Sequence, residues 1–478
     1  GIADIGGNLF FTAMGFWTLT YLTDTVYLAP ALAGIAIMAA KIWDAVTDPV
    51  MGNITDRTVS RFGAKRLYIL VGGVVSAISF VMLWTTIPSG NTTMLFIYYI
   101  VMYCLFSTGF TIIMVPYNGL LPDMIGSYTV RAKFSSIRMI WSTIGAIAAG
   151  MIPTLLIKDT LNTGMYLKVA ILFGFMFGFS AIVTFAGTWE KLKKPVRTRL
   201  ADSFSEAASV FKSRSFRIFI GIYLSGQCAM DFVSGMAIYY VDEVLNGYGS
   251  GYLIMLMGVL MVSQLLGMLV FTPIMTRTSK RTTILIGAPI RIVSTLGLLA
   301  FSYEGAPIIP ILALAAGIGI GNAATLTSIF AILADMADVD ELITSTSRPG
   351  IVSGMATFAR KISAGLSVWI IGILLSLVGY DAKLAQSGIR QALFTQRGIA
   401  MIFIIIPVVL VAFLLLFGYI FPITNKEFTV VKQDIARRRG EDDSVATDEE
   451  KRILEKATGF AYEDLWKKSN EHRIHNHK

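Results

Sequence analysis

The stretch ALAGIAIMAAKIWDAVTDPVMG, residues 31–52, is an apolar run that ends with two aspartates one helical turn apart, Asp44 and Asp48. A helix of this length crosses a hydrocarbon core about 30 Å thick at about 1.5 Å per residue. An ionised carboxylate inside a membrane is tolerated only where it faces a cavity, a partner or an ion. The stretch therefore predicts a membrane-spanning helix with a functional pair of acids on one face.

The composition of the whole chain extends this prediction to the rest of the fold. Of 478 residues, 55% are hydrophobic and 15% are charged, with a mean hydropathy of +0.67, whereas soluble domains carry about 25% charged residues. We predict an all-α polytopic membrane protein with twelve transmembrane helices in two six-helix bundles. The predicted spans are 5–27, 31–54, 67–87, 94–118, 134–157, 166–187, 216–241, 252–275, 282–301, 307–334, 351–378 and 397–421.

A polar, basic stretch separates the spans into two sets of six, an arrangement typical of two-fold transporters. We predict an N-terminal six-helix bundle over 1–188, a cytoplasmic linker over 189–215, a C-terminal six-helix bundle over 216–425 and a cytoplasmic tail over 426–478. In the tail, Thr447, Glu450 and Gly459 predict a capped helix. We interpret the tail as solvated, with a regulatory partner site as the alternative.

The net charge of +9 lies mainly in short loops between spans, which does not indicate nucleic-acid binding. The loop after the second span contains Arg57, Arg61, Lys65 and Arg66, whereas the loop PSGNTT after the third span has no charge. Because lysine and arginine are retained on the cytoplasmic side, both termini are expected there. The protein is expected to lie in the plasma (inner) membrane, with the lipid bilayer as a partner.

Sequence signatures of an enzyme are absent. There is no Walker-type motif and no nucleophile–base arrangement, and the three histidines all fall within the last seven residues. We therefore predict no catalytic residues, no cofactor and no metal site beyond one for Na⁺. Cys104 and Cys228 lie inside spans and do not indicate a disulfide framework.

Asp44 and Asp48 are expected to need a shared proton or a hard cation such as Na⁺ between them. Thr47 flanks the pair, and Pro49 leaves the carbonyl of Ala45 without its usual donor. Lys361 in the eleventh span is the expected counter-charge. Its neighbour Arg360 points about 100° away on a helix, so we expect only one of the two to face the centre. The alternative is a purely structural pair that locks helices together through basic partners.

Other polar groups at membrane depth are candidates for binding a polyhydroxylated substrate. Arg138 and Asp231 are further intramembrane charges that we expect to approach each other across the two halves, unless Arg138 snorkels to the cytoplasmic edge. Aromatic rings and amides suit the faces and hydroxyls of a sugar. The full set of predicted substrate-binding residues is Asn8, Tyr117, Asn118, Arg138, Trp141, Asp231, Gln227 and Thr357.

Several longer motifs resemble the glycoside–pentoside–hexuronide:cation symporter family of the major facilitator superfamily, and the resemblance covers all twelve spans. The motifs are YLTDTVYL (21–28), KIWDAVTDPVMG (41–52), VPYNGLLPDM (115–124), ADMADVDE (334–341) and FARKISAGL (358–366). The resemblance implies that Asp44, Asp48, Thr47 and Thr111 bind the coupling cation and that Lys361 interacts with them. It also implies that Arg138 belongs to the sugar pocket. The acids that hold the sugar in melibiose-transporting members are replaced here by Asn8 and Met114.

The resemblance further implies a cytoplasmic gate in which acids of one half meet arginine and lysine of the other. Its predicted members are Asp56, Arg57, Arg131, Asp335, Asp338 and Glu341.

Together these features predict a secondary active transporter that carries a small-molecule sugar or glycoside with Na⁺ or H⁺ by alternating access. An acidic glycoside such as a uronide is included, and the protein is expected to function as a monomer. Two alternatives stay open at this point: a cation-coupled symporter of a lysophospholipid-like or other non-sugar substrate, and a non-transporting membrane sensor.

Overall fold

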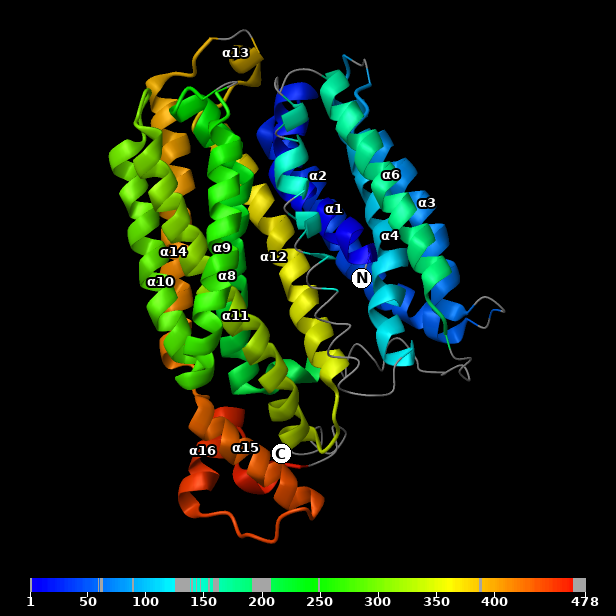
Figure 1. The fold of residues 1–478 in the computed structure, drawn as a ribbon, viewed down its shortest axis with the longest axis vertical. Coiled ribbons are helices and arrows are strands. Elements are labelled where there is room, and N and C mark those ends of the chain that lie inside the picture. The colour runs from blue at the N-terminus through cyan, green and yellow to red at the C-terminus, as the bar shows by residue number, and fades with distance from the viewer. Residues whose placement is uncertain are drawn as a thin grey trace.

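The computed structural model shows an all-helical protein, and the residues it describes contain no strand (Figure 1). The described residues are 2–466 apart from 59, 61–62, 88–89, 125–137, 139–140, 143, 147, 154, 158–162, 191–207, 248–249 and 387–388. The predicted fold class is confirmed as all-α.

The long helices follow the predicted apolar runs closely. They are α1 Ile2–Thr20, α2 Pro30–Arg57, α3 Ala64–Leu83, α4 Thr92–Met124, α6 Thr163–Gly187, α8 Arg214–Tyr239, α9 Tyr252–Arg277, α10 Lys280–Gly297, α11 Ile308–Thr344, α12 Pro349–Leu377 and α14 Leu393–Ile420. Shorter helices are η1 Tyr21–Thr25, η2 Ser209–Lys212, η3 Tyr240–Val244, η4 Leu298–Phe301, α13 Ala382–Gln386, α15 Asn425–Arg439, α16 Asp448–Thr458 and η5 Tyr462–Asp464.

Ten helices of the described chain are long and apolar enough to cross a membrane. Helix α1 is not among the ten, and the predicted fifth span, 134–157, lies largely outside the described residues apart from a short apolar stretch, Ile144–Pro153. The predicted count of twelve spans therefore stays a prediction.

Local sequence signals explain where several helices begin. Pro30 and Pro349 occupy the first positions of α2 and α12, where proline is favoured because its missing N–H would be unpaired in any case. Ser213 and Ser279 cap α8 and α10 by accepting hydrogen bonds from the backbone N–H groups of Phe216 and Thr282. Such caps satisfy donors that the helix itself cannot pair.

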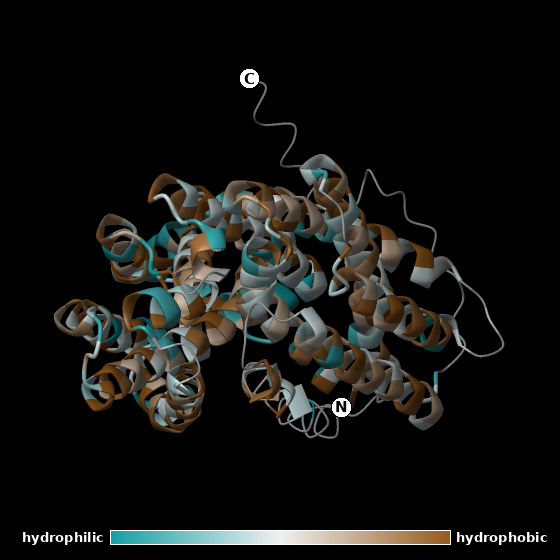
Figure 2. Cartoon of the chain, turned by 90° about the horizontal axis from the view of Figure 1, so that it is seen from above, coloured by the Kyte–Doolittle hydropathy of each residue, from teal (hydrophilic) through white to brown (hydrophobic). Residues whose placement is uncertain are grey.

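The long helices stand side by side in two groups, α1 to α6 and α8 to α14 (Figure 1). Seen from above, hydrophobic residues colour much of the outer rim (Figure 2). Among the large hydrophobic side chains, Phe175 is 71% exposed and Ile309 is 77% exposed. Large apolar side chains with this exposure are expected to contact lipid. The boundaries predicted for the two bundles and the linker stay predictions, because most of the linker lies outside the described residues.

Helices α2 and α12 pack directly against each other and join the two groups. Glycines make this close approach possible, because a Cβ atom added at Gly372 would lie 2.2 Å from the carbonyl oxygen of Pro30. A Cβ atom added at Gly34 would lie 2.9 Å from the Cα atom of Trp369. Small residues at such crossings let helix backbones come together inside a membrane. This crossing brings the middle of α2 next to the middle of α12.

The first helix of each group ends in the same unusual way. Both α1 and α8 continue into a five-residue π-helix, η1 and η3. Each π-helix is followed two residues later by a non-glycine residue with positive φ, Tyr27 at 63° and Asn246 at 55°. This repeated local structure at corresponding places is typical of transporters built from internal repeats.

The two groups also touch at the end opposite α15 and α16. The hydroxyls of Thr23 and Tyr239 are 2.7 Å apart, and the Tyr380 hydroxyl donates to the Asp24 carboxylate at 2.9 Å. These contacts connect η1 with α8 and with the segment after α12. The groups are therefore held together at this end and through the α2–α12 crossing.

The polar tail is folded and docked, which corrects its interpretation as a solvated segment. Its predicted capped helix is confirmed: α16 starts after Thr447, carries a capping box with Glu450 and ends at Gly459 with φ 84°. Leu454 of α16 and Val431 of α15 are fully buried. They belong to a cluster with bundle residues such as Phe216 and Leu342. A few apolar side chains at helical spacing are enough to attach the tail to the second group.

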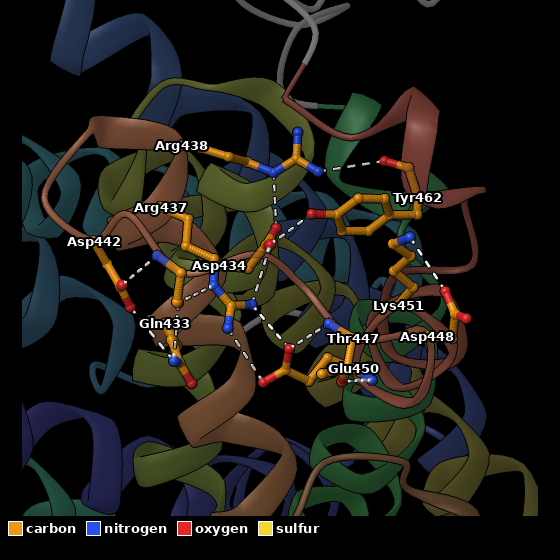
Figure 3. A network of polar contacts seen from close by, with 11 residues as sticks. Gln433, Asp434, Arg437, Arg438, Asp442, Thr447, Asp448, Glu450, Lys451 and Tyr462 are labelled. Carbon is orange, nitrogen blue, oxygen red and sulfur yellow. Dashed lines mark hydrogen bonds and ion pairs between the residues drawn. The ribbon is translucent and has the colours of Figure 1, made fainter.

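A network of polar contacts holds α15, α16 and η5 together (Figure 3). Arg437 binds Glu450 with two hydrogen bonds of 3.1 and 3.3 Å. The carboxylate of Asp434, which is fully buried, accepts from Arg438 at 2.7 Å and from the Tyr462 hydroxyl at 2.9 Å. Buried charges need such partners, so these contacts define one arrangement of the tail.

The tail should loosen in acid. Hydrogen bonds from the Arg437 guanidinium and then from the backbone N–H of Thr447 lower the pKa of the Glu450 carboxyl. A lowered folded-state pKa stabilises the fold above the ordinary glutamate value of about 4.3, and this contribution is lost as the pH falls through the folded-state value. We expect backbone amide hydrogen exchange of residues 448–458, corrected for intrinsic rates, to accelerate as the pH falls from about 4.3 through the lower folded-state pKa of Glu450.

Glu450→Gln is the matched variant for this experiment, because glutamine also completes a capping box but does not titrate. It should remove the acid-dependent step that Glu450 contributes to the exchange profile. An identical pH profile in the wild type and the variant would show that Glu450 does not control the packing of the tail.

Candidate functional site

The α2–α12 crossing places Lys361 between the two acids of the opening motif. The Nζ atom of Lys361 lies 2.8 Å from Asp44 Oδ2 and 2.5 Å from Asp48 Oδ2. Helix α4 adds Thr111, whose hydroxyl is 2.8 Å from Asp44 Oδ1 and 2.9 Å from Asp48 Oδ1. The four residues thus form one site built from three helices.

The site presents oxygen ligands, as hard cations require. Besides the carboxylates and Thr111, the Thr47 hydroxyl lies 3.5 Å from the Thr111 hydroxyl and donates to the backbone carbonyl of Asp44 at 3.2 Å. The Asp44 side chain is 7% exposed and that of Asp48 is 26% exposed. The predicted cation ligands are therefore adjacent, with an ammonium group at their centre and partial access through Asp48.

A second ion pair lies on the other side of α12. Arg360 donates to both oxygens of Asp231 on α8, at 2.7 and 2.6 Å. The expectation that only one of Arg360 and Lys361 could face a central partner is wrong, because acids on two different helices flank α12. Because adjacent residues of a helix point about 100° apart, Arg360 contacts α8 while Lys361 contacts α2.

A third cluster surrounds Arg138 in the first group of helices. Its guanidinium binds both oxygens of Asp4, at 2.8 and 3.0 Å, and donates to Asn118 Oδ1 at 2.8 Å. The Tyr117 hydroxyl donates to Asp4 at 2.6 Å, and the guanidinium carbon lies 4.3 Å from the centre of the Tyr117 ring. The expected approach of Arg138 to Asp231 is not found, because each binds a partner within its own half.

The remaining predicted substrate residues do not converge on one place. Asn8 donates to Ser142. Trp141 is 37% exposed, Gln227 is partly buried on α8, and the Thr357 hydroxyl donates at 2.9 Å to the carbonyl of Ser353 in its own helix. Sequence position alone did not show which side of each helix these residues occupy.

A small cavity next to the carboxylate pair was not predicted. It has a volume of about 60 Å³ and lies between α1, α2, α4 and α12. Its walls are Phe10, Met14, Lys41, Asp44, Tyr103, Phe106, Ser107, Phe110, Arg360, Lys361 and Ala364. Lys41, one turn before Asp44 in the opening motif, could have been found from its spacing. A larger hollow of about 530 Å³ between α3 and α6 has only apolar lining and lies away from these charges.

The predicted gate acids are bound by partners other than those expected. Asp335 pairs with Lys280 of α10, and Asp338 pairs with Lys432 of the tail at 2.8 Å. Glu341 pairs with Arg439, also of the tail. Asp338 and Glu341 reach α15 because α11 extends to Thr344, beyond its predicted end at 334. Arg131 and the side chains of Asp56 and Arg57 lie outside the described residues.

Comparison with known proteins assigns this architecture to a family. The family described as "MFS/sugar transport protein" matches residues 1–425. Similar proteins include the isoprimeverose transporter of Lactiplantibacillus pentosus, at 25% identity over 94% of this chain and 92% of the relative. The glucuronide carrier protein homolog of Escherichia coli is 23% identical over 92% of this chain and 94% of the relative.

A vertebrate relative is also similar. The sodium-dependent lysophosphatidylcholine symporter 1-A of Danio rerio is 23% identical over 77% of this chain and 75% of its own length. Among solved structures, the xylose transporter of E. coli in a partially occluded inward-open conformation has a TM-score of 0.61. It is 16% identical and covers 89% of this chain and 97% of the transporter. That likeness shows the fold.

Proposed function

The chain belongs to the MFS/sugar transport protein family, and from that premise we propose that it couples the entry of a sugar or glycoside to that of Na⁺ or H⁺. Membership in this family makes the protein a multi-pass membrane transporter rather than an enzyme. The observation that carries the proposal is the position of Lys361, whose ammonium group bridges Asp44 and Asp48.

The bridging lysine supplies a simple coupling step. Asp44, Asp48 and the hydroxyls of Thr47 and Thr111 would hold Na⁺, or the carboxylates would share a proton. Either event offsets one of the two negative charges that hold Lys361, which weakens the hold on its ammonium group and favours its departure from the pair. Because α12 belongs to one bundle and α2 to the other, breaking this bridge loosens the contact between them. Binding of the cation is thereby linked to the rocking of the bundles.

Substrate recognition in this proposal uses polar groups from both bundles. Arg138, Asn118, Tyr117 and Asn8 belong to the first bundle, and Asp231 with Gln227 belongs to the second. Hydrogen-bonding groups and aromatic faces of this kind suit a sugar. The bundles would close around it from both sides.

We further propose that both termini lie in the cytoplasm and that the protein acts as a monomer in the plasma membrane. The basic loop residues and the tail support this orientation, because α15 and α16 lie at the end of the bundles where α2 ends and α3 begins (Figure 1). Lysine and arginine are retained on the cytoplasmic side. The contacts of Thr23 with Tyr239 would then close the outer face.

A second candidate keeps the coupling ion and changes the substrate. Similarity to a sodium-dependent lysophosphatidylcholine symporter favours a lysophospholipid-like ligand. Such a ligand would enter from the bilayer, whereas a sugar would enter from water. Competition by lysophosphatidylcholine against glycoside uptake separates the two candidates.

Uptake into proteoliposomes tests the proposed function. We expect accumulation of at least one glycoside from a panel of pentosides, hexosides and uronides when a Na⁺ gradient or a pH gradient is imposed alone. Only the coupling ion should drive accumulation, and an ionophore that collapses its gradient should stop it. Equal uptake with and without both gradients, for every compound including lysophosphatidylcholine, would contradict cation-coupled symport.

A further inference from the structure

Three basic residues, which we call the basic corner, lie at the end of the second group that carries the tail. Arg277 is the last residue of α9, Arg281 lies in the first turn of α10, and Lys426 lies in the first turn of α15. Among the described residues, none of the three has an acid as an ion-pair partner. Three neighbouring bases differ, because each binds an acid of α11: Lys280, Lys432 and Arg439.

The start of α15 lies directly against the turn between α9 and α10, which brings the three bases together. The side-chain amide of Asn425 donates to the backbone carbonyl of Thr278 at 2.8 Å. The Nζ atom of Lys280 lies 4.9 Å from the centre of the Phe428 ring. Arg277 and Lys426 are the sequence neighbours of Thr278 and Asn425, and both are exposed.

The acid that follows Lys426 in the sequence does not neutralise the basic corner. The carboxylate of Glu427 accepts hydrogen bonds from the backbone N–H of Thr424, at 2.8 Å, and from the Thr424 hydroxyl, which closes the capping box of α15. Three bases and this acid leave a net charge of +2 (3 − 1). The first turn of α10 adds the partial positive charge of a helix N-terminus. The corner therefore attracts an anion.

The basic corner borders the surface that faces lipid. The guanidinium carbon of Arg281 lies 5.2 Å from the centre of the Tyr419 ring, and Tyr419 is 63% exposed in the last turn of α14. Exposed tyrosines gather where a membrane meets water. The stacking on Tyr419 thus holds the Arg281 guanidinium at the height expected for lipid headgroups.

Helices α10 and α14 pack side by side next to this corner (Figure 1). A Cβ atom added at Gly418 of α14 would lie 2.9 Å from the Cγ2 atom of Ile284 in α10. Large apolar side chains are exposed on both helices along this seam, with Leu416 52% and Val293 69% exposed. A ligand at the corner therefore meets positive charge at one end and apolar surface at the other.

From this combination we infer that the basic corner binds the headgroup of an anionic phospholipid, whose acyl chains lie along the seam of α10 and α14. Phosphate oxygens accept charge-assisted hydrogen bonds from arginine and lysine. A water-soluble anion would satisfy the charges but leave the apolar side chains uncovered, whereas the bilayer supplies both parts. The bound lipid connects the turn between α9 and α10 with the junction of α14 and α15.

Competition between two lipids tests this inference without requiring transport. Purified transporter in a neutral detergent is mixed with equal amounts of palmitoyl-oleoyl phosphatidylglycerol and palmitoyl-oleoyl phosphatidylcholine, which differ only in the headgroup. Native mass spectrometry then measures the ratio of the two adducts. We expect phosphatidylglycerol to bind at least about tenfold more tightly, because each base near an anionic headgroup contributes to its binding. Equal binding of the two lipids would overturn the inference.

A triple variant locates the headgroup. Arg277→Gln, Arg281→Gln and Lys426→Gln together should reduce the preference for phosphatidylglycerol to near unity, and surface substitutions of this kind are expected to leave the fold intact. The matched control removes three charges from other exposed positions: Arg390→Gln, Arg397→Gln and Arg452→Gln. The control should keep the preference of the wild type. An unchanged preference in the corner variant, or an equal loss in the control, would overturn the assignment.

The wild type alone provides two further readouts, which decide the question even if the corner variant does not fold. The preference for phosphatidylglycerol should decline as the salt concentration rises, because salt screens charges at a surface. Inorganic phosphate at the same concentration as the lipid should leave the preference nearly unchanged, since it lacks the apolar part. Complete competition by inorganic phosphate, or a preference that does not depend on salt, would overturn a headgroup site for an anionic lipid.

Discussion

Asp48→Asn is expected to abolish gradient-driven accumulation of substrate, and Asp44→Asn should do the same. Each change removes one of the two carboxylates that hold Lys361 and that would hold the coupling ion. Downhill exchange of substrate should persist, because the polar groups proposed to bind the substrate are unchanged. Accumulation and exchange measured in the same proteoliposomes separate these two activities.

The fold should survive either change, since Lys361 keeps the other aspartate and Thr111 keeps a hydrogen-bond partner. Asp448→Asn is the matched control: it makes the same chemical change in the tail, where the Asp448 side chain is 93% exposed. The control should transport like the wild type. Full accumulation by both Asp44→Asn and Asp48→Asn would rule out this pair as the coupling site.

The second large effect concerns stability rather than transport. Asp231→Asn leaves the Arg360 guanidinium, on a residue only 8% exposed, without its carboxylate. Breaking a buried ion pair by removing one partner costs about 3–5 kcal/mol. We expect a correspondingly large loss of thermal stability in detergent, measured by intrinsic fluorescence and by recovery of monodisperse protein.

The double variant Asp231→Asn with Arg360→Gln identifies the cause. It removes both charges and retains hydrogen-bonding groups, so it should recover most of the lost stability. The exposed pair of Arg390 and Glu304, with side chains 41% and 52% exposed, supplies a control. Glu304→Gln should cost less than about 1 kcal/mol. A double variant as unstable as Asp231→Asn would show that charge pairing is not what stabilises this contact.

The positions of the helices could be predicted because a membrane fixes the length of an apolar run. The run predicted over 216–241 corresponds to α8 with η3, and that over 252–275 corresponds to α9. Helix α11 continues ten residues past its predicted end at 334. Its last three turns contain the charged residues of ADMADVDE. The hydropathy pattern ends the predicted span before these charges, but a helix can continue through them outside the membrane.

The carboxylate pair could be predicted because both acids lie on one helix, four residues apart. Partners on other helices depend on how each helix is rotated in its bundle, and a single sequence does not fix that rotation. Arg138 illustrates this: its partner Asp4 lies 134 residues away on α1. Arg360 is a second example, because its partner Asp231 can be identified only when α8 is known to lie beside α12.

The docking of the tail was missed because its apolar signal is sparse. Val431, Ile435 and Leu454 are buried, but they are separated by charged residues that dominate the composition of 426–466. Those charges bind one another and the end of α11, which no pattern within the tail indicates. The tail shows that a polar segment can be ordered when its charges have partners.

A tethered ammonium group inside an ion site acts as a resident competitor. Its local concentration is set by the chain and does not vary with the medium. If Lys361 vacates the carboxylates one time in a hundred, the apparent dissociation constant for the ion rises about a hundredfold above the intrinsic value. Packing around the Lys361 side chain could then set the ion concentration at which the carrier loads, without any change in the residues that bind the ion.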